Sequence, residues 1–188
     1  MSRKSLCYKT LLLTVATLLF TCMQVHAQCK PPAKPAVALS PAAQASVTLN
    51  GKSLTIDYCA PSLRGRKVGD QIAPYGKVWR TGANTATTFH TDANLMIGDQ
   101  AVPAGTYTLY TLPSQQGWKL IINKQTGQWG TVYNEAQDLG RVAMSDGAAP
   151  SAPVEVFKIQ FEQTHGASTE LHLMWGNTNV YASVKAAK

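Results

Sequence analysis

From Ser46 to Val184, short runs of alternating apolar and polar residues are separated by turn residues. Side chains of a β-strand point alternately to its two faces, so a period of two predicts strands with one buried face. About ten such runs occur at close spacing, and no long segment follows the helical period of 3.6. The pattern predicts an all-β fold, an antiparallel β-sandwich with a jelly-roll-like arrangement.

Local features place several of the strands. Asn50-Gly51 lies between two alternating runs, and both residues tolerate the positive φ of a type I′ turn, which predicts a hairpin. Gln125–Gly140 follows neither period and predicts a loop with at most one helical turn, at Asn134–Gln137. Further strands are expected at Lys77–Arg80, Thr87–Thr91, Asn94–Ile97, Thr106–Leu112, Trp118–Ile122, Arg141–Met144, Val154–Phe161, Glu170–Trp175 and Asn179–Val184.

The N-terminal residues have the layout of a secretory signal peptide. Basic residues precede the apolar run Thr10–Phe20, and Val25-His26-Ala27 supplies a cleavage site, so residues 1–27 are expected to be removed. Export to the periplasm or the extracellular space follows. A lipid anchor at Cys22 is disfavoured because a threonine precedes it. Residues 28–45, rich in Pro and Ala, predict a flexible tether, and 46–185 form a single domain.

Cys29 and Cys59 remain after the signal peptide is removed. In an oxidising compartment an even pair favours one disulfide, and closing a loop of about 30 residues stabilises a fold by roughly 3–4 kcal/mol. The alternative is that Cys29 lies in a mobile tail and pairs with nothing.

Several classes of function are disfavoured. The net charge is +7, but the only compact basic run is Arg64-Gly-Arg-Lys67, which is too short for a nucleic-acid-binding stripe. The common hydrolase, zinc-protease and nucleotide-binding motifs are missing from the sequence. His90, His165 and His172 are widely separated and are interpreted as surface residues, so neither a metal nor a cofactor is expected.

One stretch departs from the strand pattern and combines Arg64, Arg66, Trp79, Arg80 and Asn84. Arginine presents a planar fork of donors, and tryptophan a flat apolar face, so the cluster suits a pocket for a small polar or anionic ligand. The alternative is architectural: Arg80 caps loop carbonyls, Asn84 closes a turn, and the two earlier arginines brace the excursion of residues 61–76.

Trp129, followed by a glycine in the long loop, is a second candidate for ligand contact. A tryptophan in such a place also commonly plugs the open end of a sandwich. Trp118 and Trp175 begin or end apolar strands and are expected in the core.

Two functions follow from these residues. The leading hypothesis is a non-catalytic exported module that binds a small polar ligand, a glycan or a partner protein. The alternative is a cell-envelope hydrolase or lyase in which Asp57 or His90 is the general base and Arg80 the clamp for an anionic group. Asp57 lies on the strand face opposite Ile56, which predicts exposure to solvent.

Four segments together resemble a known family. They are Tyr58-Cys-Ala-Pro-Ser-Leu-Arg-Gly-Arg66, Pro74-Tyr-Gly-Lys-Val-Trp-Arg-Thr-Gly-Ala-Asn84, Pro103-Ala-Gly-Thr-Tyr107 and Gln128-Trp-Gly130. In this order they resemble the bacterial family called domain of unknown function 2911, over roughly residues 47–181. The resemblance implies an exported protein without an assigned activity. Family members often have a glutamate after Gly-Ala-Asn, where this chain has Thr85.

Overall fold

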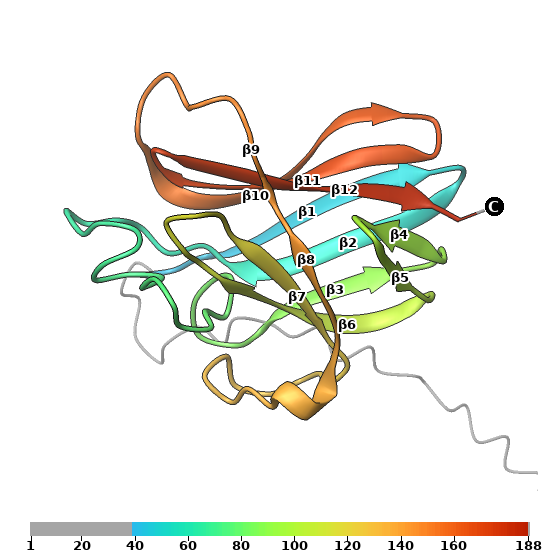
Figure 1. Cartoon of the computed structure of the whole chain (residues 1–188), viewed down its shortest axis with the longest axis horizontal. Helices are drawn as coiled ribbons and strands as arrows, with labels where there is room; N and C mark the ends of the chain where they lie inside the picture. The colour runs from blue at the N-terminus through green and yellow to red at the C-terminus, as the bar shows by residue number, and fades with distance from the viewer. Residues whose placement is uncertain (1–38, 188) are drawn as a thin grey trace, which may run out of the picture.

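The computed structural model describes residues 39–187, which form two antiparallel β-sheets packed face to face (Figure 1). One sheet has the order β1-β2-β3-β6-β7-β8, and the other has the order β10-β11-β12-β4-β5, with β9 also pairing with β12. The predicted all-β sandwich is confirmed. The strands are β1 (Ala42–Leu49), β2 (Lys52–Cys59), β3 (Thr87–Thr91), β4 (Leu95–Ile97), β5 (Gln100–Val102), β6 (Gly105–Leu112), β7 (Lys119–Asn123), β8 (Asp138–Ala143), β9 (Ser145–Asp146), β10 (Val154–His165), β11 (Ser168–Gly176) and β12 (Thr178–Ala186).

The hairpin at Asn50-Gly51 sets the register of the first two strands. The two residues have φ angles of 49° and 77°, as a type I′ turn requires. Leu49 therefore pairs with Lys52, and the alternation carries Leu54 into the core. A slip of one residue would turn every apolar side chain of β2 to the outside.

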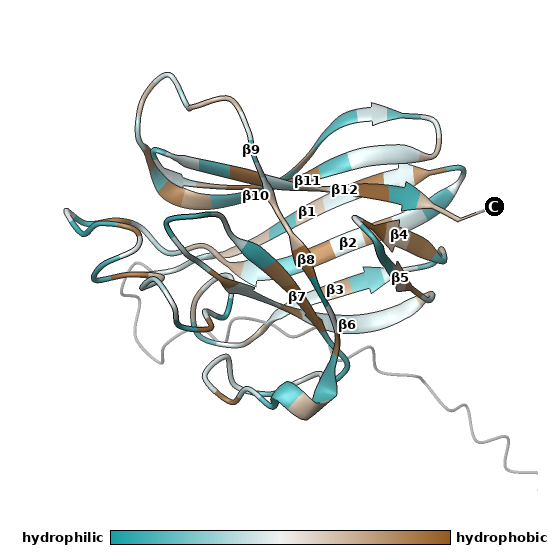
Figure 2. Ribbon diagram, viewed as in Figure 1, coloured by the Kyte–Doolittle hydropathy of each residue, from teal (hydrophilic) through white to brown (hydrophobic). Residues whose placement is uncertain are grey.

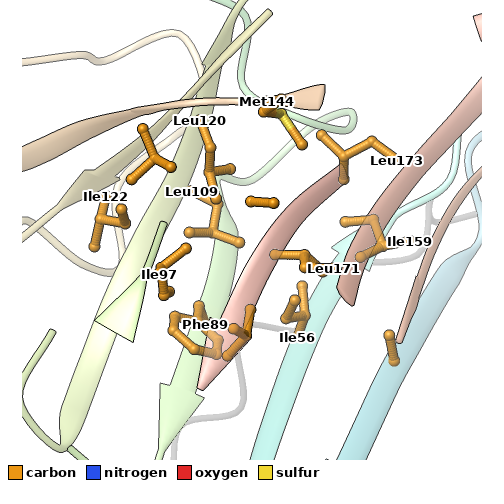
Figure 3. Close-up of a cluster of buried hydrophobic side chains, with 14 of the residues drawn as sticks. Ile56, Phe89, Ile97, Leu109, Leu120, Ile122, Met144, Ile159, Leu171 and Leu173 are labelled. Atoms are coloured by element: carbon orange, nitrogen blue, oxygen red, sulfur yellow. The ribbon is translucent and has the colours of Figure 1, made fainter. Parts of the chain in front are cut away.

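Apolar side chains of the two inner faces form the core. Figure 3 shows Ile56 and Phe89 of one sheet near Leu171 of the other, and Figure 2 shows apolar and polar residues interleaved along the strands. Ile159 pairs with Leu173 across β10 and β11, so the buried apolar side chains of these two strands lie side by side. Alternation thus gives each sheet one apolar face.

Four aromatic side chains form a cluster, three of them in the core and Trp79 packed against it. The ring of Trp79 stacks on Trp175 at 5.3 Å and 18°, and it meets Phe157 edge-on at 5.0 Å and Trp118 at 6.4 Å. Trp118 and Trp175 are buried, which confirms their assignment to the core.

The prediction of a strand at Lys77–Arg80 is wrong. Trp79 exchanges two backbone hydrogen bonds with Thr111, at 2.7 and 2.8 Å, and this is an isolated bridge. Gly76 before it and Thr81 after it both have positive φ, of 75° and 52°. Left-handed residues cannot continue a strand, so the alternation of 77–80 never extends into a ladder.

The N-terminal boundary of the domain also differs. β1 begins at Ala42, so residues 42–45, assigned to the tether, belong to a strand, and Ala45 is buried. Small alanines carry little apolar signal, and their pairing with residues 56–59 of β2 decides their conformation. The signal peptide, the rest of the tether before residue 39 and Cys29 lie outside the described residues. The disulfide to the buried Cys59 stays a prediction.

The loop between β7 and β8, residues 124–137, covers the outer face of the first sheet at the bottom of Figure 1. Under it Tyr110, Ile121 and Asn123 are buried, although they point away from the main core. Tyr110 donates to Val132 O at 2.9 Å, and Asn123 Nδ2 donates to Asn134 O at 2.9 Å. The loop contains the single predicted helical turn, a 3₁₀ turn at Glu135–Gln137.

Asp138 fastens the end of this loop to the sheet. Its carboxylate accepts from Asn123 Nδ2 at 2.8 Å, from the Tyr133 hydroxyl at 2.6 Å and from Arg141 Nε at 3.0 Å. Arg141 also pairs with Glu135 at 2.6 Å. Three donors thus meet at one carboxylate, and hydrogen bonds to an ionised acceptor are stronger than those between neutral groups.

Alkaline pH is expected to loosen the loop through Tyr133. Burial, together with the hydrogen bond to Asp138, raises the pKa of Tyr133 to about 12, from 10.0. Between about pH 10 and pH 12 this tyrosine ionises in the unfolded chain but stays protonated in the folded one. Its contribution to the free energy of unfolding is therefore complete below pH 10 and is lost as the pH rises from about 10 towards 12. Ultraviolet titration of tyrosinate should show one fewer late-titrating group in Tyr133→Phe. A difference spectrum with its midpoint at pH 10 would contradict the assignment.

Candidate functional site

Two loops that are distant in the sequence meet beside the start of β3. Gly130 N donates to Asn84 O at 3.0 Å, and Ala86 N donates to Gln128 O at 3.3 Å. Thr85 and Trp129 form a bridge between the two segments. We call Arg80, Asn84 and Trp129, which this contact brings together, the Arg80–Trp129 corner.

The first loop of the corner has an imposed backbone shape. Thr81 is fully buried with φ of 52°, and the left-handed region costs a β-branched residue about 1–2 kcal/mol. Thr81 O accepts from Thr87 Oγ1 at 2.8 Å, and Thr81 Oγ1 donates to Thr111 Oγ1 at 3.3 Å. Ala83 N donates to Cys59 O at 3.1 Å. Strained conformations persist only where the surroundings over-determine them, so this loop is rigidly held.

Gly130 lets the two loops touch. A Cβ at this position would lie 2.4 Å from Arg80 Cδ and 2.7 Å from Asn84 O, so no larger residue fits without displacing them. Arg80 Nη1 donates to Asn84 O at 3.3 Å, the one hydrogen bond of this guanidinium within residues 39–187. Four of the five N–H donors of the side chain are thus not taken up by the described part of the chain.

Trp129 stands at the surface of the second loop. Trp129 is 53% exposed, so it does not plug the end of the sandwich. Its indole is instead accessible to solvent. Gln128, beside it, donates from Nε2 to Thr108 Oγ1 at 3.2 Å and to Tyr110 Oη at 3.0 Å, which anchors the loop to β6. Gln128 Oε1 is buried and has no hydrogen-bond partner within the described chain.

The other predicted ligand residues lie elsewhere. Arg66 donates from Nε to Leu63 O at 3.0 Å and from Nη2 to Ser62 O at 2.9 Å, and Arg64 Nη2 donates to Leu39 O at 3.0 Å. These bonds brace the loop after β2, as the architectural alternative expected. Trp79 belongs to the aromatic cluster described above. The structure therefore gathers Arg80, Asn84 and Trp129 and separates them from the other three.

The residues of the enzyme hypothesis are not assembled around Arg80. Asp57 accepts from Gln44 Nε2 at 2.7 Å. His90 is exposed on β3, with Nδ1 3.0 Å from Thr106 Oγ1 and Nε2 3.0 Å from Asp92 Oδ1. Across residues 39–187, neither Asp57 nor His90 forms a hydrogen bond or an ion pair with Arg80. An exposed pair of this kind, like that of His90 and Asp92, contributes little to stability.

His172 was expected at the surface, and this expectation is wrong. It points away from the core but is only 4% exposed. Tyr181 stacks on its ring at 5.0 Å and 17°, Nδ1 lies 2.9 Å from Asn179 Oδ1, and Nε2 lies 2.9 Å from Glu170 Oε2. Neighbouring long side chains cover an outer-face residue, which strand alternation cannot reveal.

The described residues contain neither a metal-binding cluster nor a membrane-spanning helix. No group of three or more His, Cys, Asp and Glu side chains in residues 39–187 is placed to hold a metal ion. In the same residues, no helix has the length and apolar character needed to cross a bilayer.

A family model described as "Protein of unknown function (DUF2911)" matches residues 40–184. The chain belongs to this family. Neither a curated protein nor a solved structure matches it. In this DUF2911 chain, two of the four segments that carry the resemblance, 74–84 and 128–130, are the ones that meet at the Arg80–Trp129 corner. Thr85, which stands where relatives often have a glutamate, lies in the same contact, with Oγ1 4.0 Å from Cys59 Sγ.

Proposed function

We propose that this DUF2911 protein is an exported, non-catalytic module that binds a glycan at the Arg80–Trp129 corner. The observation that carries the proposal is the half-exposed indole of Trp129, which stands on a firmly anchored loop beside an arginine with unused donors. Export rests on the N-terminal sequence, and it would place the corner where cell-envelope and extracellular polysaccharides are accessible.

The chemistry of the corner fits a sugar. The apolar face of a pyranose ring packs on an indole, and its hydroxyl groups accept from guanidinium N–H donors or bond to an amide such as that of Asn84. Arg80 fits this role because Nη1 alone is engaged, by Asn84 O. A planar fork can bind two adjacent hydroxyl oxygens at once.

The rigidity of the corner lowers the entropic cost of binding. Gln128 and Gly130 fasten the Trp129 loop on both sides of the indole, through Thr108, Tyr110 and Asn84. A loop that is already held in place loses little freedom when a ligand arrives, which matters for the weak individual contacts of sugar recognition.

Affinity electrophoresis in gels containing soluble polysaccharides, followed by a glycan array, tests the proposal. The wild-type protein is expected to be retarded by at least one polysaccharide, and Trp129→Ala is expected to weaken binding by at least about tenfold, the factor that corresponds to 1.4 kcal/mol. Mass spectrometry should recover the bound oligosaccharide unchanged.

Val132→Ala is the matched control, because Val132 is 51% exposed on the same loop and its N–H donates to Trp129 O at 2.8 Å. It should bind like the wild type. Glycan binding that survives Trp129→Ala, or no retardation by any polysaccharide in the panel, rejects the proposal, and so does cleavage of the bound oligosaccharide.

A further inference from the structure

A second site is visible at the end of the sandwich where β11 turns into β12. Two hollows, of about 340 and 270 Å³, adjoin this turn, and both are lined by Asn177 and Thr178. The loop after β2 forms the other wall of the larger one, and both segments lie at the left of Figure 1. Its volume is within the range of roughly 300–1,000 Å³ that is typical of small-molecule sites.

The floor of the larger hollow is apolar. Leu63, Val68 and Pro153 line it together with Gly176. Gly176 has φ of 60°, and a Cβ there would lie 3.7 Å from Val68 Cγ2 and 3.9 Å from Leu63 Cδ1. The turn and the loop thus sit close together, which gives the hollow a floor without polar side chains.

The rim of the larger hollow is cationic. Arg66 and Lys67 both line it, and neither takes part in a salt bridge within residues 39–187. The Arg66 guanidinium is oriented by Leu63 O, at 3.0 Å from Nε, and by Ser62 O, at 2.9 Å from Nη2, while Nη1 has no partner in the described chain. A fixed guanidinium with a free edge is a ready donor pair for a carboxylate.

The acidic side chains of the neighbouring segments do not line the larger hollow. Glu155 Oε1 accepts from the backbone N of Arg64 at 2.9 Å, and Asp146 lines the smaller hollow. Asp70 is exposed further along the same loop. Neither Asp70 nor Glu155 lines the larger hollow, so its lining side chains carry positive charge only.

We propose that the larger hollow binds a small carboxylate that has an apolar body. The apolar body occupies the floor of Leu63, Val68 and Gly176, and the carboxylate reaches Arg66 and Lys67 at the rim. This site shares no residue with the Arg80–Trp129 corner, so it is independent of the glycan proposal.

Titration of the full mature protein with octanoate, followed by amide chemical shifts in NMR, tests this site. Shifts are expected at Val68 and at residues 176–178, with weak affinity that falls as salt is added, because the rim is open to solvent. Octanamide, which has the same apolar body without the charge, should bind at least about tenfold more weakly. Equal binding of octanoate and octanamide, or no shift at these residues, overturns the proposal.

Arg66→Gln should weaken octanoate binding by at least about tenfold. Arg64→Gln is the matched control, since Arg64 is an exposed arginine of the same loop and does not line the hollow. Arg66→Lys keeps the positive charge but not the planar fork of donors. It therefore provides a second test of Arg66 if the glutamine variant disturbs the loop. The assignment of Arg66 would be falsified if Arg64→Gln lost as much binding as Arg66→Gln and Arg66→Lys. Trp129→Ala should bind octanoate normally, because Trp129 is not part of this site.

Discussion

Trp79→Ala is expected to lower the free energy of unfolding by about 3 kcal/mol, the lower end of the cost of deleting a buried aromatic side chain, because Trp79 is partly buried and packs against the core. The deletion removes the partner on which Trp175 stacks and the edge-on contacts with Phe157 and Trp118. Urea denaturation followed by far-ultraviolet circular dichroism measures the change. The melting temperature should fall by roughly 10 °C for a domain of this size.

Trp129→Ala supplies the control for this prediction, because it removes the same side chain from an exposed position. Its stability should stay within about 0.5–1 kcal/mol of the wild type, as surface substitutions usually do. A cost for Trp79→Ala no larger than that of Trp129→Ala would mean that the aromatic cluster does not support the core. The pair of variants also separates a structural tryptophan from the tryptophan that we propose binds the ligand.

Asp138→Ala is expected to cost about 2–4 kcal/mol and to release the loop of residues 124–137. The substitution leaves the Tyr133 hydroxyl and Arg141 Nε without their acceptor, and it removes one of the two acceptors of buried Asn123 Nδ2. Loss of hydrogen bonds to a charged group, with donors left unsatisfied, accounts for a change of this size. Denaturant unfolding measures it, and faster amide exchange in 124–137 should accompany it.

Glu135→Ala is the control for Asp138→Ala, because Glu135 pairs with the same Arg141 but its side chain is 74% exposed, against 11% for Asp138. An exposed ion pair is worth about 0–1 kcal/mol. Similar effects of the two substitutions would argue that burial of Asp138 is unimportant. Because the loop carries Trp129, Asp138→Ala is also expected to weaken glycan binding, although Asp138 is not part of the corner.

The strands could be anticipated wherever alternation was strong. Thr87–Thr91 became β3 with the expected bounds, and the strands expected at Val154–Phe161 and Glu170–Trp175 lie within β10 and β11. Weak or absent alternation hid the short strands β5 and β9 and the alanine-rich start of β1. In those segments pairing with a neighbouring strand, rather than local composition, decided the conformation.

The candidate site could be anticipated only in part. The arginines and aromatics between residues 64 and 84 stand out in the sequence, but the same residue types serve three purposes. Arg66 braces its loop, Trp79 packs against the core, and Arg80 lies against Gly130 in the loop that carries Trp129. A planar donor fork or an indole is suited to each of these roles. The residue type therefore limits the roles that a side chain can have, and its neighbours in the folded structure determine which role it takes.

The sequence alone was enough to predict the class of fold, the type I′ turn at Asn50-Gly51 and the burial of Trp118 and Trp175 in the core, because each depends on residues close together in the chain. The meeting of Asn84 with Gly130, the burial of His172 and the cover that residues 124–137 provide were decided only in three dimensions. Their cause is the packing of loops and side chains that lie far apart along the chain or on an outer face, and alternation carries no information about such contacts.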